Sequence, residues 1–373
     1  MPDKKKHHYV PRFYLKLFAT EIAAKDPRTI SMYNIPKELL ISAASIADQC
    51  AKDWFYGTSD NLEDAMSTLE SAWASFFRDF RDKTIPPQPK SKDHLLLLLF
   101  ISIQMLRTNR RALDTNESIR MMMKTITAQD SNLSVTGDGD FDWELKDPVF
   151  LSLRSFLPVA HYLDDLKICL LKTHMPSAFV TSDDPVFKYN LYCESFTEGG
   201  NTGATNTGLL IFLPISPEFC VLFYDSGVYK VGRPGKQGPL LVTSADVDVL
   251  NGLQYIGADA NLYFSAGFSS GYFKGLSATY GKARQEIGVR TVEAEEVGNP
   301  LNILVHQYHH IPNLRLNLSF LSIRRNARRV PLADRIRSYR REIELTGPDP
   351  ALGSKSRKFI PIKKSTGQPR SKM

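Results

Sequence analysis

Several familiar catalytic signatures are missing from this sequence. Its 373 residues contain no Walker loop, no G-x-G-x-x-G and no H-E-x-x-H pattern, which argues against P-loop enzymes, nucleotide-cofactor dehydrogenases and zincins. The four cysteines are widely spaced and form no C-x-x-C pair. We therefore expect buried thiols in place of a zinc ribbon or a disulfide framework.

Long apolar runs are also scarce. The most hydrophobic stretch, LLLLLFISIQML at 95–106, is too short to span a bilayer. The lysines at 4–6 do not begin a signal peptide, because His7 and His8 stand where an apolar segment would start. The sequence therefore predicts a cytoplasmic protein with no membrane partner.

Positive charge is concentrated at one end of the chain. The net charge is +7, but residues 324–373 hold fifteen Lys or Arg against four Asp or Glu. Because this segment carries +11, the other 323 residues carry −4. The overall charge therefore overstates the case for a basic binding face on the body, and nucleic acid is expected to bind through the basic tail. The arginines predicted to contact it are Arg324, Arg325, Arg328, Arg329, Arg337 and Arg340.

The hydrophobic period changes along the chain. Apolar residues at three-to-four spacing predict an amphipathic helix over 61–83 and a second, central helix over 92–113, capped by Ser91. From about residue 166, short runs rich in Val, Ile, Phe and Tyr are typical of strands. We predict an α+β fold, with a helical N-terminal half packed on a mostly antiparallel sheet.

The same pattern divides the chain into regions. The core region is 1–270, with a helical part at 1–165 and a β-rich part at 166–270. A mixed α/β extension is expected at 271–323, and a basic helix with a disordered tail at 324–373.

Two short motifs stand out in the core region. HHYVPRFYL follows the first six residues, and FVTSDDPV lies at 179–186. With LPISPEF at 213–219 and NGLQYIGADANLYFS at 251–265, they resemble the domain of unknown function 4238 family over roughly residues 5–270. Asp184 stands where an asparagine is common in that family. The resemblance implies one fold over this region and the location of a site, but no activity.

The opening motif supplies two candidate catalytic residues. His7 and His8 are neighbours on an extended segment, so they point to opposite faces and one is expected to enter a site. Histidine suits metal binding or proton transfer because its ordinary pKa is near neutrality. The alternative is that one of them packs on Tyr9 or Tyr14 and bonds to a backbone carbonyl.

Gln104 and Arg107 lie on one face of the most hydrophobic predicted helix. A buried arginine is costly unless it is paired, so Arg107 predicts a buried carboxylate, phosphate or backbone partner. The alternative to a ligand is a structural ion pair with Glu63, Glu70 or Asp183.

Carboxylates supply the expected metal ligands. Asp183 follows a predicted strand, where it is suited to bind a divalent ion, to act as a base, or to accept bonds from its own turn. Glu63 and Glu70 lie on nearly the same helical face, about 10.5 Å apart along the axis, which is too far to share one metal ion unaided. Either one is a ligand while the other orients a neighbouring group, or both belong to a solvated acidic face. The predicted set for Mg²⁺ or Mn²⁺ is His8, Glu63, Glu70 and Asp183.

Two weaker clusters lie further along. Asn251, Gln254 and Asp259 have helical spacing and are expected to cap and cross-link the sheet. HQYHH at 306–310 is metal-like in composition and is expected to be a surface segment.

Gathered into one site, these groups favour a metal-dependent hydrolase of phosphodiesters. His7, His8, Gln104, Arg107 and Asp183 would be its catalytic residues, acting on nucleic acid or a phosphorylated ligand, in a defence or mobile-element setting. The alternatives are a non-catalytic module that binds an acidic ligand or nucleic acid, and a purely structural polar network.

Overall fold

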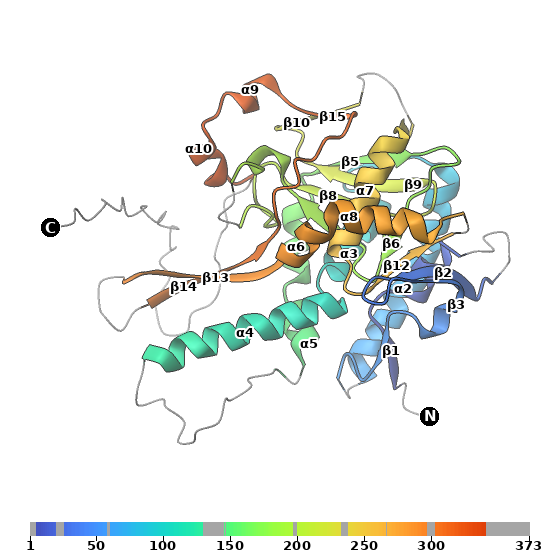
Figure 1. Ribbon diagram of the computed structural model, residues 1–373, viewed down its shortest axis with the longest axis horizontal. Helices are drawn as coiled ribbons and strands as arrows, with labels where there is room; N and C mark the ends of the chain where they lie inside the picture. The colour runs from blue at the N-terminus through green and yellow to red at the C-terminus, as the bar shows by residue number, and fades with distance from the viewer. Residues whose placement is uncertain are drawn as a thin grey trace.

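The computed structural model of the protein combines helices with several mostly antiparallel sheets (Figure 1). It describes residues 5–19, 26–57, 60–129, 145, 147–196, 200–232, 238–265, 267–296 and 303–340. Ten α-helices lie within these ranges: α1 Arg12–Lys16, α2 Asp60–Lys83, α3 Lys92–Gln104, α4 Asn109–Gln129, α5 Pro148–Leu153, α6 Phe156–Leu163, α7 Ser244–Gly257, α8 Ser270–Glu286, α9 Arg325–Arg328 and α10 Leu332–Ile336.

The strands are short and fall into five sheets. Their bounds are β1 Lys6–His8, β2 Thr29–Asn34, β3 Leu39–Ser45, β4 Ala51–Asp53, β5 Lys167–Lys172, β6 Thr181–Ser182, β7 Phe187–Tyr189, β8 Leu210–Pro214, β9 Phe219–Tyr224, β10 Tyr229–Val231, β11 Leu240–Leu241, β12 Asn261–Phe264, β13 Gly288–Glu296, β14 Ile303–His310 and β15 Leu321–Ile323. The largest sheet has the order β11-β5-β9-β8-β7, and a second has the order β3-β2-β12-β6. Three antiparallel pairs, β1–β4, β10–β15 and β13–β14, complete the set.

The five-stranded sheet is the middle layer of the molecule. Successive side chains of a strand point to opposite faces, and in β8 Ile211 and Leu213 join the apolar core that includes α2 and α3. Leu210 and Phe212 join the other core, with α7. Both faces are therefore covered, which explains why β8 is buried along its whole length.

The prediction of a helical N-terminal half is wrong. β2 and β3 lie within the first 165 residues, and β2 pairs antiparallel with β12. Conversely, α7 and α8 lie in the half expected to be β-rich. The physical reason is that β2 lies between β3 and β12, and β12 is more than two hundred residues away. Local periodicity carries no information about such distant pairing.

The predicted central helix is interrupted. Ser91 caps α3 as expected, since its side chain accepts a hydrogen bond from the His94 amide. The helix ends at Gln104, however, and α4 begins at Asn109. The short junction at 105–108 separates the two helices.

The predicted basic helix is also interrupted. Pro331 precedes α10 and separates it from α9, because proline lacks the amide that a continuing helix needs. The predicted disordered tail lies outside the described residues, as does everything beyond residue 340. No helix in the described ranges is both long and apolar enough to cross a membrane.

Aromatic packing fixes α3 in the first core. The Phe100 ring centroid lies 4.7 Å from that of Phe77, 5.3 Å from that of Trp73 and 5.7 Å from that of Tyr14. Phe100 is fully buried, so α1, α2 and α3 share one cluster of rings.

We predict that Phe100→Ala lowers the free energy of unfolding by about 3–5 kcal/mol, since it removes the ring that the other three contact. Leu95→Ala on the same helix is the control, because Leu95 is 53% exposed and its truncation should change stability by less than about 0.5 kcal/mol. Urea unfolding measures both; equal effects would contradict the assignment of the core.

Candidate active site

The opening histidines lie on β1, and their side chains point to opposite faces of the strand, as expected. His7 is buried, its ring stacks on Tyr56 at a centroid distance of 5.4 Å, and its Nδ1 accepts a hydrogen bond from the Tyr56 amide at 3.1 Å. His8 Nε2 donates to the Ala47 carbonyl at 3.2 Å. Tyr56 Oη donates to the His8 carbonyl at 2.9 Å. His7 is therefore the histidine that faces the interior, and Tyr56 holds both.

Gln104 and Arg107 meet this motif from the end of α3. Gln104 Nε2 donates to the Tyr9 carbonyl and its Oε1 accepts from Arg107 Nε, both at 3.0 Å. Arg107 also forms an ion pair with Glu70 at 2.9 Å. One of its terminal nitrogens lies 3.5 Å from Tyr56 Oη. The carboxylate partner predicted for Arg107 is thus Glu70, on α2.

The network of Tyr56, Glu70, Gln104 and Arg107, here called the Arg107 network, is nearly closed to solvent. The Arg107 side chain is 1% exposed and that of Glu70 is 26% exposed. Burial raises the pKa of Tyr56 to about 12, so its hydroxyl stays protonated at neutral pH. A buried, paired arginine that joins β1, α2 and α3 stabilises the fold, because removing either partner would strand a buried charge.

Asp183 has a different environment. Its Oδ1 accepts a hydrogen bond from the Asp259 amide at 2.7 Å, and its Oδ2 accepts from the Ala260 and Asn261 amides, each at 2.8 Å. Burial raises its pKa to about 7, although these amides oppose the rise. Asp183 therefore holds the turn before β12, and not its own turn as the structural alternative expected.

The predicted metal ligands are not gathered into a metal site in the part of the chain that the structure describes. Within those ranges, no three His, Cys, Asp or Glu side chains form a group that could hold a metal ion. His8 bonds to a carbonyl, Glu70 pairs with Arg107, and Asp183 is bound by amides. The geometry gives no support to the set His8, Glu63, Glu70 and Asp183.

A second polar network surrounds Asp184, next in sequence. Thr108 Oγ1 donates to its Oδ1 at 3.1 Å, and Arg111 donates to its Oδ2 at 2.9 Å. Asp184 is 2% exposed, and burial raises its pKa while Arg111 opposes the rise. The residue that departs from the family pattern is thus the anchor of this network.

Asp114 extends the network along α4. It pairs with Arg111 at 2.9 Å and with Arg110 at 3.5 Å. On its other side, Asp114 Oδ2 lies 3.2 Å from His309 Nε2, on β14. Sheet β13–β14, α4 and the Asp184 turn therefore converge on one carboxylate.

His309 is the least satisfied group in this network. Its side chain is 17% exposed, yet neither ring nitrogen makes a well-aligned hydrogen bond within the described part of the chain. Burial, with Arg111 nearby, lowers its pKa to about 4. Burial also lowers the pKa of Lys188, on β7, to about 8. At neutral pH the imidazole is therefore uncharged.

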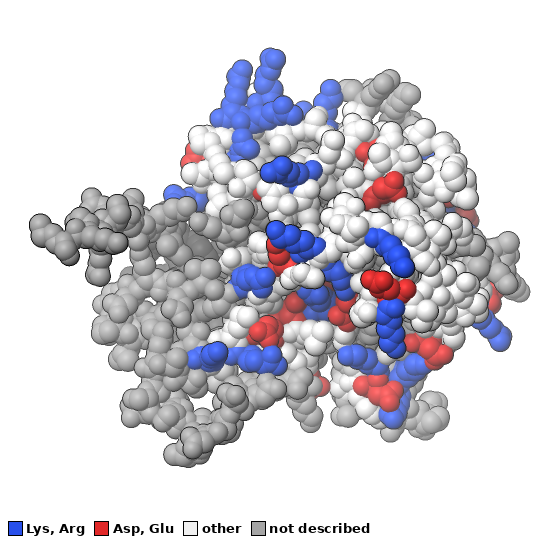
Figure 2. All heavy atoms as spheres, viewed as in Figure 1, with Lys and Arg blue, Asp and Glu red and all other residues white. Residues whose placement is uncertain are grey.

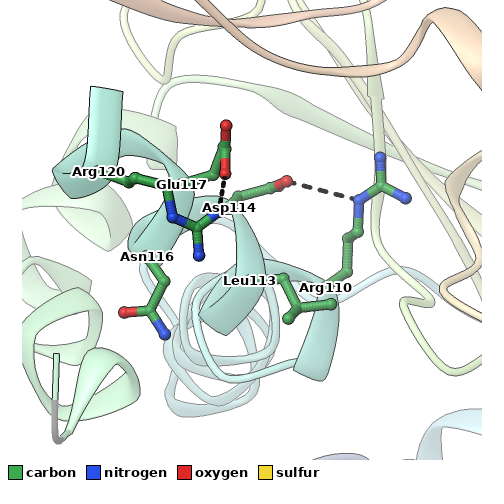
Figure 3. Close-up of a pocket in the computed structure, with 6 residues that line it drawn as sticks. All are labelled: Arg110, Leu113, Asp114, Asn116, Glu117 and Arg120. Carbon is green, nitrogen blue, oxygen red and sulfur yellow. Dashed lines mark hydrogen bonds and ion pairs between the residues drawn. The ribbon is translucent and has the colours of Figure 1, made fainter. Parts of the chain in front are cut away.

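A cavity of about 260 Å³ opens beside Asp114. Figure 3 shows its lining on one face of α4, at three-to-four spacing, with Arg110 paired to Asp114 and Arg120 paired to Glu117. The Arg120 pair is 2.7 Å long. The complete lining is Arg110, Leu113, Asp114, Asn116, Glu117 and Arg120.

The expectation that HQYHH is a surface segment is wrong for His309. The segment lies in β14, whose Gln307 side chain bonds to the Ser118 carbonyl of α4 at 2.7 Å. Because side chains alternate along a strand, His309 points to the same face as Gln307. The sequence signal that could have found the site is the charged run Arg110, Arg111 and Asp114 directly after a buried helix.

Asn251 and Gln254 of the predicted cluster cross-link α7 to the sheet at β6, as expected. Asn251 Oδ1 accepts from the Val180 amide at 2.9 Å. Gln254 accepts from Ser182 Oγ at 2.9 Å and donates to the Pro185 carbonyl at 3.0 Å. Both side chains hold the segment that carries Asp183 and Asp184. Asp259, which lies beyond α7, accepts a hydrogen bond from Asn109.

The chain also carries a G-x-S-x-G pattern over 267–271, a signature of α/β-hydrolases. Its serine, Ser269, caps α8 and accepts a hydrogen bond from the Tyr272 amide at 3.4 Å. The preceding β12 pairs antiparallel with both of its neighbours, unlike the parallel strands of that fold. Here the pattern serves as a helix cap.

The predicted nucleic-acid arginines divide into two groups. Arg324 donates to the Ser226 carbonyl at 2.9 Å, and Arg340 donates to the Tyr162 carbonyl at 3.1 Å and pairs with Asp165. These two are bonded to the body. The other four, Arg325, Arg328, Arg329 and Arg337, are exposed and make no such bond to the body among the described residues.

Comparison with known proteins places the chain in a family. Residues 6–267 match the family described as protein of unknown function DUF4238, and the chain belongs to it. The matched range agrees with the extent expected from the motifs. Neither the curated proteins nor the solved structures contain a match to this chain.

We predict that Arg107→Leu lowers the free energy of unfolding by about 3–5 kcal/mol, because it leaves Glu70 and Gln104 without their partner. Arg78→Leu on α2 is the control, since Arg78 is exposed. Urea unfolding of both variants measures the difference. If the two variants were equally stable, the Arg107 network would have no structural role.

We predict an acid-sensitive contribution from His309. Its pKa is about 4 in the folded protein, against an ordinary 6.5, so its contribution is fully present above pH 6.5 and is lost as pH falls toward 4. The loss is about 3 kcal/mol, at about 1.4 kcal/mol per pKa unit. Other groups that titrate nearby, including Asp114, Asp184 and Lys188, are present in both wild type and His309→Gln. The difference between the two proteins therefore isolates the contribution of His309.

The measurement is therefore a comparison of these two proteins by urea unfolding between pH 7 and 4.5. Wild type should lose stability more steeply than His309→Gln over this range. Parallel curves would show that His309 titrates normally.

Proposed function

We propose that this protein is a phosphodiesterase-like hydrolase whose active site is the network of Asp184, Arg111, Asp114 and His309 beside the α4 cavity. The observation that carries the proposal is the partly buried, neutral imidazole of His309. It lies against a carboxylate, and its buried ring nitrogens lack a well-aligned hydrogen bond among the described residues. Such a group costs about 1–3 kcal/mol unless a water or a ligand satisfies it.

The charges around His309 suit an anionic ligand. Arg110, Arg111 and Lys188 bring three positive charges, and Asp114 and Asp184 bring two negative charges. The surplus is one positive charge with the imidazole neutral. Arginine is suited to phosphate because its planar guanidinium can donate two parallel hydrogen bonds.

The acid–base groups match hydrolysis. A bound phosphate would raise the pKa of His309 from about 4 toward neutrality, since a negative charge favours the protonated ring. His309, oriented by Asp114, then takes a proton from the attacking water. Water forms the new bond to phosphorus, the ester P–O bond breaks, and Lys188, whose pKa is about 8, supplies the proton to the leaving oxygen.

The size of the cavity favours a small group. Pockets for drug-sized ligands have volumes of about 300–1000 Å³, whereas this one has about 260 Å³. It suits a phosphoryl group with part of its ester, so the rest of a substrate would extend into solvent past Leu113, which is 51% exposed.

A second candidate function is binding of the same anion without turnover. It is favoured by the ion pairs of Arg111 with Asp114 and Asp184, each 2.9 Å long, because such pairs hold the guanidinium in a fixed position for recognition. The predicted Mg²⁺ or Mn²⁺, the cytoplasmic location and the defence setting stay predictions.

We predict that wild type hydrolyses bis(p-nitrophenyl) phosphate and that His309→Gln and Asp114→Asn each lower kcat by about 10²–10⁴-fold, the usual contribution of a general base. His174→Gln is the control, because His174 is an exposed histidine outside the network. Assays with Mg²⁺, with Mn²⁺ and with a chelator test the metal prediction.

Phosphate affinity, measured by calorimetry, separates the two candidates. Arg120→Gln should weaken binding while leaving stability unchanged, since Arg120 is 46% exposed. If the protein binds phosphate but hydrolyses the ester under none of these conditions, the hydrolase proposal fails and the non-catalytic binding function is supported. A wild-type protein that neither binds phosphate nor hydrolyses the ester would refute both.

A further inference from the structure

Three arginines attach the segment 324–340 to the body. Arg324 Nε donates to the Ser226 and Tyr229 carbonyls, at 2.9 and 3.1 Å. Arg335 lies 4.6 Å above the Tyr192 ring and donates to the Tyr192 carbonyl at 3.2 Å. Arg340 pairs with Asp165, and its side chain is 4% exposed. The segment is therefore held at its beginning, middle and end.

The four other arginines of the segment are presented to solvent. Arg325, Arg328, Arg329 and Arg337 are exposed, and none forms an ion pair with a residue that the structure describes. In Figure 2, positive side chains stand together at the top of the molecule, over α9, whereas positive and negative side chains are mixed elsewhere on this face. The anchoring arginines thus fix a surface whose remaining arginines are free to bind.

We propose that α9 and the residues that follow it, here called the α9 surface, bind single-stranded nucleic acid through its phosphate backbone. The inference goes beyond the proposed hydrolase and does not depend on it, since no residue of the α4 cavity takes part.

The spacing of the arginines suits a phosphate backbone. Arg325 and Arg328 are three residues apart, and Arg325 and Arg329 are four apart, so their side chains start about 5–6 Å from one another on one helical face. Guanidinium groups bind phosphate oxygens in pairs, which a solvated lysine cannot do. The surface therefore offers several neighbouring phosphate contacts.

Tyr339 favours a single strand over a membrane. Its side chain is 48% exposed, and its backbone is fixed by a bridge to Asn206. An exposed aromatic ring on a fixed backbone, two residues after the exposed Arg337, offers a platform for an unpaired base. A membrane-binding helix needs an apolar face, whereas the one buried residue of α9 is Ala327, which packs into the body.

The test is fluorescence anisotropy of a labelled single-stranded oligonucleotide with the full chain. We expect the triple variant Arg325→Gln, Arg328→Gln, Arg329→Gln to bind about 100-fold more weakly near 0.1 M salt. Its log–log salt slope should be smaller by about 2, because each single-strand phosphate contact contributes about 0.7. The matched control is Arg78→Gln, Arg154→Gln, Lys274→Gln, which removes the same charge from exposed positions elsewhere.

Tyr339→Leu distinguishes base stacking from charge alone. We expect it to weaken oligonucleotide binding by about 10-fold, within the range for loss of one stacked base, and to leave the salt slope unchanged. Equal losses in the two triple variants would overturn the proposal, because affinity would then follow net charge. Unchanged affinity in the α9 variant would also overturn it, and so would binding to phosphatidylserine vesicles with no binding to the oligonucleotide.

Discussion

A buried guanidinium at the end of α3 must find a carboxylate, and much of this structure is arranged around that requirement. Arg107 pairs with Glu70 of α2 and is held by Gln104, which in turn bonds to the backbone of the opening motif. Breaking such a pair leaves a charge in a medium where it is poorly solvated. The sequence of the junction therefore determines how β1, α2 and α3 meet, and the aromatic cluster around Phe100 fills the space beside it.

The chain after the same junction also carries the side chains of a second polar network. After α3 ends, Thr108 and Arg111 reach Asp184, and Asp114 reaches His309. Each network holds a buried nitrogen without a well-aligned partner in the described residues: Nη2 of Arg107 in the first network, and the ring nitrogens of His309 in the second. The second network also reaches a cavity, through Asp114. The two adjacent aspartates of the family motif thus have different roles. Asp183 holds a turn through three amides, and Asp184 holds the candidate site.

Local sequence patterns predicted only part of this arrangement. Helix α2, the Ser91 cap, α7 and the strands of the five-stranded sheet follow from period, caps and turn residues, which act over short distances. The cost of burying Arg107 predicted that it has a partner, and Glu70 was one of several partners left open. The pairing of β2 with β12 and the contact of His309 with Asp114 join residues more than 190 apart, so no local pattern contains them. The predicted site included Asp183, whereas Asp184 belongs to the candidate site. Which of two adjacent aspartates faces a site depends on the conformation of their turn, and tertiary contacts determine that conformation.

The central claim is that His309 marks a phosphate site, and NMR of its imidazole tests this most directly. The ring nitrogen and carbon resonances would be followed over pH 4–8, with and without inorganic phosphate. We expect a pKa well below 6.5 in the free protein, because the ring is buried beside Arg111, and a rise when phosphate is added. An ordinary pKa that does not respond to phosphate would contradict the claim.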